Sequence, residues 1–331
     1  NDNRQCFMRK NLLLAAGTAL LSSALLLVAA TGFVATTMLA YLTPLPLLIL
    51  GLSHKKDCVG IAGGMASLLL FFLATPVVAI VYFVLVAGPV TLLCQRITQV
   101  NQQKENQGIN GHQTSPLSGY LCTLLAAIPC FILTAVFIYC WLYQEQSVGT
   151  SLSEKADLII ENYRHALLQR NLDVKPEVGA QLLLLKDTLL NTVPAMMGIF
   201  WMTLLIINGV LARYALTRVA TISLSPVKLV QIELPQSLII IFIVSSLMAG
   251  LLSGDISLYC LNLSIILAFP ILLSGLGVVH IASERTKYKR GILFAIYTAV
   301  FMSRWATFIL ILIGLLDHFV KIKARISKPS G

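Results

Sequence analysis

Two long stretches without a charged side chain constrain the fold of this chain more than any other feature. Neither Asn11–Ser53 nor Cys58–Gln95 contains an Asp, Glu, Lys or Arg. A helix rises about 1.5 Å per residue, so it needs about 20 apolar residues to cross a hydrocarbon core of about 30 Å. Each stretch is therefore long enough for two membrane-crossing helices joined by a turn.

The composition of the whole chain agrees with this interpretation. Of its 331 residues, 57% are hydrophobic and only 11% are charged, whereas a typical soluble domain has about 25% charged residues. A soluble protein of this size would lack the polar surface to cover itself. The predicted fold class is therefore all-α, a polytopic transmembrane helix bundle of about ten segments with a helical extracytoplasmic insert.

The segments follow the apolar runs between short polar loops. They are expected near residues 11–31, 34–52, 58–74, 76–95, 119–143, 193–213, 236–253, 256–281, 288–302 and 305–319. The chain accordingly divides into an N-terminal transmembrane region (1–143), an insert (144–192) and a C-terminal transmembrane region (193–331) that ends in a basic tail.

The insert over 144–192 is predicted to be helical and extracytoplasmic. Ser151–Glu154 fits a capping box, and apolar residues from Leu152 to Leu167 recur at helical spacing, which predicts an amphipathic helix. A second helix is expected to begin at Pro176. The insert has five Lys or Arg and seven Asp or Glu, so it lacks the basic excess of cytoplasmic loops.

The net charge of +10 lies mostly in short loops between apolar runs. That is the positive-inside pattern of a cytoplasmic-membrane protein, and ten segments place both termini in the cytoplasm. No nucleic-acid partner is predicted. Met8 is a natural start, which would make residues 1–7 upstream sequence. Arg9 and Lys10 before an apolar run also fit a signal peptide.

The last apolar run, residues 291–316, allows two interpretations. A single long helix would bury Arg304 near the middle of the membrane, where an arginine costs at least about 2.5 kcal/mol. A hairpin that turns at Ser303–Arg304 would place Arg304 at the outer surface and the basic tail inside. The charge rule favours the hairpin.

Prolines and glycines mark breaks and close contacts. Pro44 and Pro46 remove backbone donors from the second segment, and such a break needs protein or water to satisfy the freed carbonyls. Gly60 and Gly64 form a G-x-x-x-G pattern, which predicts close helix packing.

Gly275 and Gly277 begin like a dinucleotide-binding fingerprint. The third glycine is missing, and the pattern ends a membrane segment instead of following a strand, so both glycines are assigned to helix packing. The sequence contains no P-loop, no H-E-x-x-H and no G-x-S-x-G. Its five histidines are scattered and its seven cysteines form no C-x-x-C pair. No enzyme activity, metal site or cofactor is predicted.

Three polar residues lie in or beside the apolar segments. Asn208 lies within the sixth segment, His280 closes the eighth, and Asp317 is near the end of the tenth. Polar groups in lipid are costly and usually have a partner or a function. Each could form an interhelical hydrogen bond, or the three could line a polar pocket; the sequence alone does not show that they meet.

Several short motifs resemble the YybS-like family of bacterial multi-pass membrane proteins. They are Thr43–Leu47 before a basic loop, Asn208–Arg213, Glu233–Pro235 before a segment, Ser274–His280, and Gly314–Asp317 leading to a basic tail. This family is a domain of unknown function that looks distantly similar to the substrate-binding subunits of energy-coupling-factor vitamin transporters.

The resemblance implies a small-molecule-binding or transport subunit without its own ATPase, set in the lipid bilayer beside an energising membrane-protein partner. The alternative is a non-transporting membrane scaffold or assembly factor, in which the amphipathic helix at 151–171 docks another protein.

Overall fold

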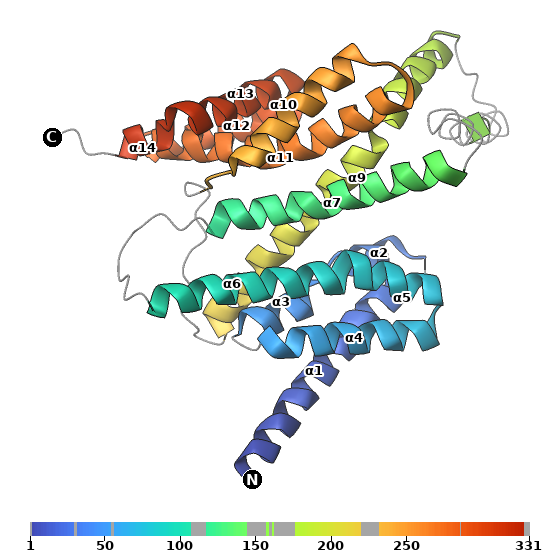
Figure 1. Ribbon diagram of the computed structural model, residues 1–331, viewed down its shortest axis with the longest axis vertical. Coiled ribbons are helices and arrows are strands. Elements are labelled where there is room, and N and C mark those ends of the chain that lie inside the picture. The colour runs from blue at the N-terminus through green and yellow to red at the C-terminus, as the bar shows by residue number, and fades with distance from the viewer. Residues whose placement is uncertain are drawn as a thin grey trace. The chain divides into compact units, whose positions relative to one another are not determined.

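The computed structural model describes residues 2–29, 32–53, 56–106, 117–143, 157–158, 161, 176–219, 232–284 and 286–327. Every regular element within these ranges is a helix (Figure 1). The predicted all-α fold class is confirmed. The amphipathic helix expected at 151–171 lies outside the described residues apart from positions 157, 158 and 161.

The predicted apolar segments correspond in order to helices, or to consecutive pieces of one helix. The elements are α1 (Asp2–Ala29), α2 (Val34–Ala40), α3 (Leu45–Leu52), α4 (Lys56–Leu73), α5 (Pro76–Tyr82), the π-helix η1 (Phe83–Ala87), α6 (Gly88–Asn106), α7 (Leu117–Tyr143), α9 (Pro176–Val219), α10 (Gln236–Leu251), α11 (Gly254–Glu284), α12 (Lys289–Met302), α13 (Arg304–Val320) and α14 (Ile322–Ser327).

Five helical stretches in the described ranges are long and apolar enough to cross a membrane. They are Arg9–Ala29, Pro76–Gln99, Gly119–Tyr143, Asn191–Val219 and Gly254–Glu284. The bent pair α12–α13 makes a sixth if it counts as one span. The other predicted segments are shorter apolar helices: α10, for example, has 16 residues and is about 24 Å long.

The last apolar run is broken at Ser303. This residue has an extended backbone (φ −134°, ψ 121°), and it separates α12 from α13. The two helices are bent by 117° relative to each other. The break excludes a single straight helix over 291–316, and Arg304 is the first residue of α13.

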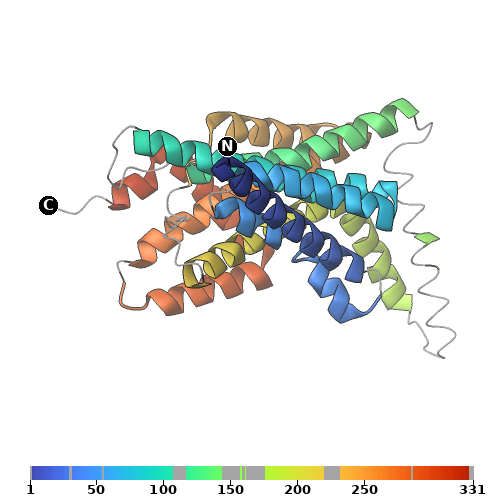
Figure 2. The same cartoon turned by 90° about the horizontal axis from the view of Figure 1, so that it is seen from below.

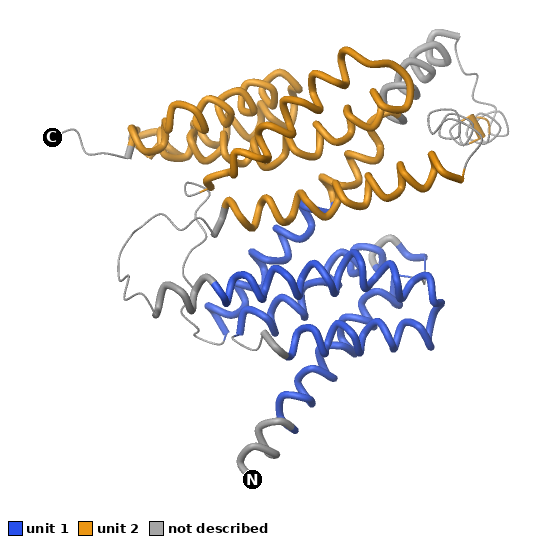
Figure 3. Tube along the Cα trace, in the orientation of Figure 1, with its two compact units in different colours: residues 1–117, 201–227 blue, residues 118–200, 228–331 orange. Residues whose placement is uncertain are grey.

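The chain forms two compact units, which are coloured separately in Figure 3. Unit 1 comprises Asn1–Leu117 and Trp201–Val227, and unit 2 comprises Ser118–Phe200 and Lys228–Gly331. The boundary between them falls within α9, so this helix contributes residues to both.

Unit 1 is built around α4, which packs against α1, α3, α5 and α6. In both views α1 crosses α4 (Figures 1 and 2). The interior of the unit is formed by apolar side chains such as Leu47, Val59, Leu70 and Val90.

Unit 2 is built around α11, which packs against α10, α12, α13 and α14. A close helix crossing joins Gly275 of α11 to Gly314 of α13. A Cβ at Gly275 would overlap the carbonyl oxygen of Leu310, and one at Gly314 would overlap that of Ile271. Small residues at this crossing let the two backbones touch.

Candidate functional site

The first feature of the site is the break between α2 and α3. The amide of Leu45 donates to the carbonyl of Leu42 at 2.9 Å instead of continuing the helical pattern to Tyr41. The Tyr41 carbonyl accepts from Nδ2 of Asn208 on α9 at 2.8 Å. Side-chain donors from other helices are what a proline break in an apolar segment requires.

A second side chain supports the same break from α1. The hydroxyl of Ser22 donates to the carbonyl of Thr43 at 2.7 Å. Ser22 Oγ also lies 2.7 Å from the hydroxyl of Tyr82 on α5. All three side chains are buried, so a short polar chain runs through an otherwise apolar interior.

The π-helix η1 is the second irregular segment of unit 1. A π-helix forms i→i+5 hydrogen bonds, and such segments occur often at functional sites. The carbonyl of Leu85 within η1 accepts from Nε1 of Trp201 at 2.8 Å. Trp201 and Asn208 lie two turns apart on α9, so one helix supplies donors to both irregular segments.

A cavity of about 100 Å³ lies among these segments. Its lining comprises Leu26, Ala40, Tyr41, Thr43, Pro44, Leu85, Val86, Trp201, Leu204 and Leu205. For comparison, a water occupies about 30 Å³ of liquid, and an apolar cavity of about 150 Å³ binds benzene. The cavity can therefore hold a few waters or a small molecule.

Asn208 borders this lining and has an unused acceptor. Its Nδ2 donates to the carbonyls of Tyr41 and Leu204, each at 2.8 Å, and both residues line the cavity. Asn208 is 1% exposed, and its Oδ1 accepts no hydrogen bond from the described residues. A buried acceptor left in this way costs about 1–3 kcal/mol, which makes it a candidate for contact with a bound molecule.

Comparison with known sequences assigns the chain to a family. Residues 20–318 match the family described as "Predicted membrane protein (DUF2232)". The chain belongs to the DUF2232 family. The match includes the break, η1 and the lining of the cavity. Curated proteins and solved structures gave no match.

DUF2232 is described only as a membrane protein, which places this chain in a lipid bilayer and assigns no activity. Among the described residues of this DUF2232 chain, no group of three His, Cys, Asp or Glu side chains could hold a metal ion.

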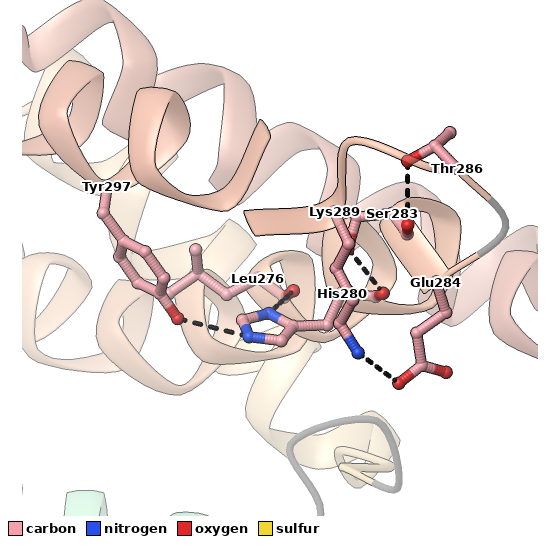
Figure 4. Close-up of polar contacts among 7 residues, drawn as sticks. All are labelled: Leu276, His280, Ser283, Glu284, Thr286, Lys289 and Tyr297. Carbon is pink, nitrogen blue, oxygen red and sulfur yellow. Dashed lines mark hydrogen bonds and ion pairs between the residues drawn. The ribbon is translucent and has the colours of Figure 1, made fainter. Parts of the chain in front are cut away.

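His280 has its own partners in unit 2. Its Nδ1 lies 3.0 Å from the carbonyl oxygen of Leu276, and its Nε2 lies 3.5 Å from the hydroxyl of Tyr297 on α12 (Figure 4). Nearby, Lys289 forms an exposed ion pair with Glu284 at 3.0 Å. The contact of His280 with Tyr297 and the ion pair of Lys289 with Glu284 each join α11 to α12.

Asp317 is paired with a residue of the basic tail. Its Oδ2 lies 3.0 Å from Nζ of Lys323, and its Oδ1 accepts from the backbone amide of Lys323 at 2.8 Å. Asn208 belongs to unit 1, whereas Asp317 and His280 belong to unit 2. Within the described contacts, no partner is shared among the three residues of the predicted polar pocket.

The predicted breaks and glycines have different surroundings. Pro44 caps α3 and Pro46 lies buried in its first turn. A Cβ at Gly60 would make an ordinary 3.5 Å contact with Thr91, and one at Gly64 would meet nothing within 4 Å. The tight contact of α4 is instead at Gly63, where an added Cβ would lie 2.8 Å from the Cβ of Ala87. Gly277 is buried in α11.

Sequence reasoning missed Asn262, which supports a proline in α9. Its Oδ1 accepts from the amide of Ala195 at 2.9 Å, and its Nδ2 donates to the carbonyl of Asn191 at 2.7 Å. In a regular helix the amide of Ala195 would donate to the carbonyl of Asn191, and Pro194 lies between these two residues. The buried carboxamide of Asn262 therefore bonds to both backbone groups beside the proline. The sequence feature that could have revealed this contact is the presence of one asparagine and one proline in two apolar segments.

Proposed function

We propose that this DUF2232 protein is a small-molecule-binding subunit of a membrane transport system, with its binding site at the cavity of unit 1. The observation that supports it most is the lining of the cavity by two interrupted helices. Discontinuous helices commonly form substrate sites in transporters, because their irregular backbone lines a cavity. The unpaired Oδ1 of Asn208 beside that lining adds a polar group for recognition.

The size of the cavity limits the ligand. At about 100 Å³ it is well below the 300–1,000 Å³ typical of sites for drug-sized ligands. The lining is mainly aliphatic and aromatic. We therefore expect a small, mostly apolar molecule with one N–H or O–H group that donates to Asn208 once the side chains adjust around it.

Transport would draw its energy from a partner. The sequence contains no P-loop, so an energising membrane protein is part of the proposal, as in the energy-coupling-factor transporters that the YybS-like family resembles. The proposal includes a bacterial inner-membrane location with both termini in the cytoplasm and the 144–192 insert outside. It assigns no catalysis and no cofactor to the chain.

Native mass spectrometry of the chain, purified gently from its own membrane, tests the binding site. We expect a discrete small-molecule adduct on the wild type. Leu204→Trp should abolish it by filling the cavity, because Leu204 lines it. The matched control is Leu211→Trp, two turns along α9 at a side chain that is 40% exposed, which should keep the adduct. An adduct that survives Leu204→Trp, or a wild type that carries only lipid, would contradict the proposal.

A membrane scaffold or assembly factor is the second candidate. None of the side chains of α12 is buried, and several large apolar ones, including Phe294, Phe301 and Met302, are exposed. This face is free for lipid or for another membrane protein. A stoichiometric protein partner without a small-molecule adduct in the same spectra would favour the scaffold.

A further inference from the structure

The ammonium group of Lys323 occupies a site made by three other elements. Its Nζ lies 3.0 Å from Oδ2 of Asp317 on α13, and donates to Oγ of Ser274 on α11 and to the carbonyl of Ile232 before α10, each at 2.8 Å. A lysine has three N–H donors, so all of them are used. The side chain is 11% exposed.

The three oxygens are held in place without α14. Asp317, Ser274 and Ile232 are all buried. Ile232 is followed by Glu233, whose carbonyl lies so close to Gly119 of α7 that a Cβ there would overlap it. Since α11 and α13 also cross tightly at Gly275, the oxygens remain together if Lys323 leaves.

The part that carries Lys323 is much less firmly held. It is a six-residue helix at the end of the described chain, and it packs on α11 and α13. It follows Lys321, which has a left-handed backbone (φ 53°) that is unfavourable for a residue other than glycine. A helix of six residues has few contacts of its own, so its release depends mainly on the bonds that Lys323 makes.

If α14 moves away with Lys323, another cation must take the place of the ammonium group beside Asp317. A buried carboxylate without a counter-charge is strongly unfavourable, so Asp317 cannot simply lose Lys323. Carboxylate, hydroxyl and carbonyl oxygens are the ligands that hard cations prefer. Spacings of 2.8–3.0 Å from the ammonium nitrogen suit K⁺, which is similar in size to ammonium, better than the smaller Na⁺.

We propose that Asp317, Ser274 and the carbonyl of Ile232 form a site for a monovalent cation of the size of K⁺, and that Lys323 is its tethered, exchangeable occupant. Water would complete the coordination of the incoming ion. Departure of Lys323 also removes its backbone hydrogen bond to Asp317 Oδ1, so cation binding releases α14. This site lies in unit 2 and does not depend on the small-molecule site of unit 1.

Thermal unfolding of Lys323→Met tests the site, because methionine keeps the apolar length of lysine and removes its charge. The midpoint of this variant should be several degrees higher in KCl than in choline chloride at equal concentration, with NaCl between them. The wild type should respond to K⁺ much less than Lys323→Met, because its own lysine competes for the site, and the double variant Asp317→Asn/Lys323→Met should respond to none of these cations. Equal midpoints of Lys323→Met in KCl and choline chloride would overturn the cation site.

Hydrogen exchange of the wild-type Lys323 amide tests whether a cation can displace Lys323 from the site. This measurement tests the proposal by itself if Lys323→Met does not fold. This amide donates to Asp317 Oδ1, so its exchange should accelerate as KCl replaces choline chloride at constant ionic strength. The Ser303 amide, which donates to Ala299, is the control and should not change. An unchanged rate at Lys323 would show a fixed lysine and overturn the proposal.

Discussion

Asn208 donates a hydrogen bond to the carbonyl oxygen of Tyr41 at 2.8 Å, although the two residues are 167 positions apart in the sequence. The side-chain amide supplies the donor that the break between α2 and α3 withholds. The same principle recurs at η1 with Trp201 and at Pro194 with Asn262. At these three described places irregular backbone is paired with a polar side chain from another helix, and each pair can be tested.

Replacement of Asn208 by leucine should destabilise the protein by about 1–3 kcal/mol. The change leaves the part-buried Tyr41 carbonyl without this donor, and an acceptor that loses its partner away from water costs about this much. Thermal unfolding in detergent measures the effect. Thr217→Ala on the exposed end of α9 is the control, since the Thr217 hydroxyl donates only to carbonyls of its own helix. A midpoint for Asn208→Leu equal to that of the control would show that the contact with Tyr41 contributes nothing.

Replacement of Trp201 by phenylalanine should cost about 1 kcal/mol or more, because the indole N–H to Leu85 is lost while an aromatic ring remains. If the cavity binds a ligand, the adduct seen by native mass spectrometry should also weaken, since Trp201 lines it. Trp305→Phe, at a side chain that is 73% exposed, should change neither quantity. Equal behaviour of the two variants would count against the role given to Trp201.

Asn262 and Pro194 should be energetically coupled. Asn262→Leu removes both hydrogen bonds to the backbone beside Pro194. In a Pro194→Ala background the helix can satisfy these groups itself, so the same substitution should cost less. A double-mutant cycle of unfolding free energies should give a coupling of about 0.5–3 kcal/mol. Additive effects would mean that the carboxamide does not compensate for the proline.

Two glycines should respond oppositely to alanine. Gly275→Ala places a Cβ against the carbonyl oxygen of Leu310 and should lower stability by about 1–3 kcal/mol, as overpacking does. Gly64→Ala meets nothing within 4 Å and should be neutral or raise stability by up to about 1 kcal/mol through helix propensity. Unfolding midpoints distinguish the two, and a tolerated alanine at position 275 would refute the tight crossing of α11 and α13.

The apolar pattern predicts some helix ends and breaks because hydropathy and proline chemistry are local. Pro176 starts α9, Ser303 separates α12 from α13, and the pair Pro44 and Pro46 marks a break, all at the expected positions. The number of complete spans was harder to predict, since a helix such as α10 is apolar throughout and still only 16 residues long.

The partners of the polar residues could not be predicted in the same way. Ser22 and Trp201 look like ordinary members of apolar helices. Each donates a hydrogen bond to a backbone carbonyl that is far away in the sequence, 21 residues for Ser22 and 116 residues for Trp201. In α4 the glycine spacing pointed to Gly60 and Gly64, whereas the neighbouring helix approaches Gly63, because the rotation of a helix about its axis is set by tertiary packing.

The π-helix η1 also sets the rotational register of the side chains of α6 relative to those of α5. A π turn accommodates one more residue than an α turn, and each residue of an α-helix advances the side-chain direction by about 100°. Deletion of one residue from Phe83–Ala87 would therefore restore a regular helix and keep the orientation of the α6 face that carries buried Val90 and Cys94. A deletion within α6 before Val90 would instead rotate this face by about 100°, so a related chain can lose a residue at η1 far more easily than in the regular helix that follows.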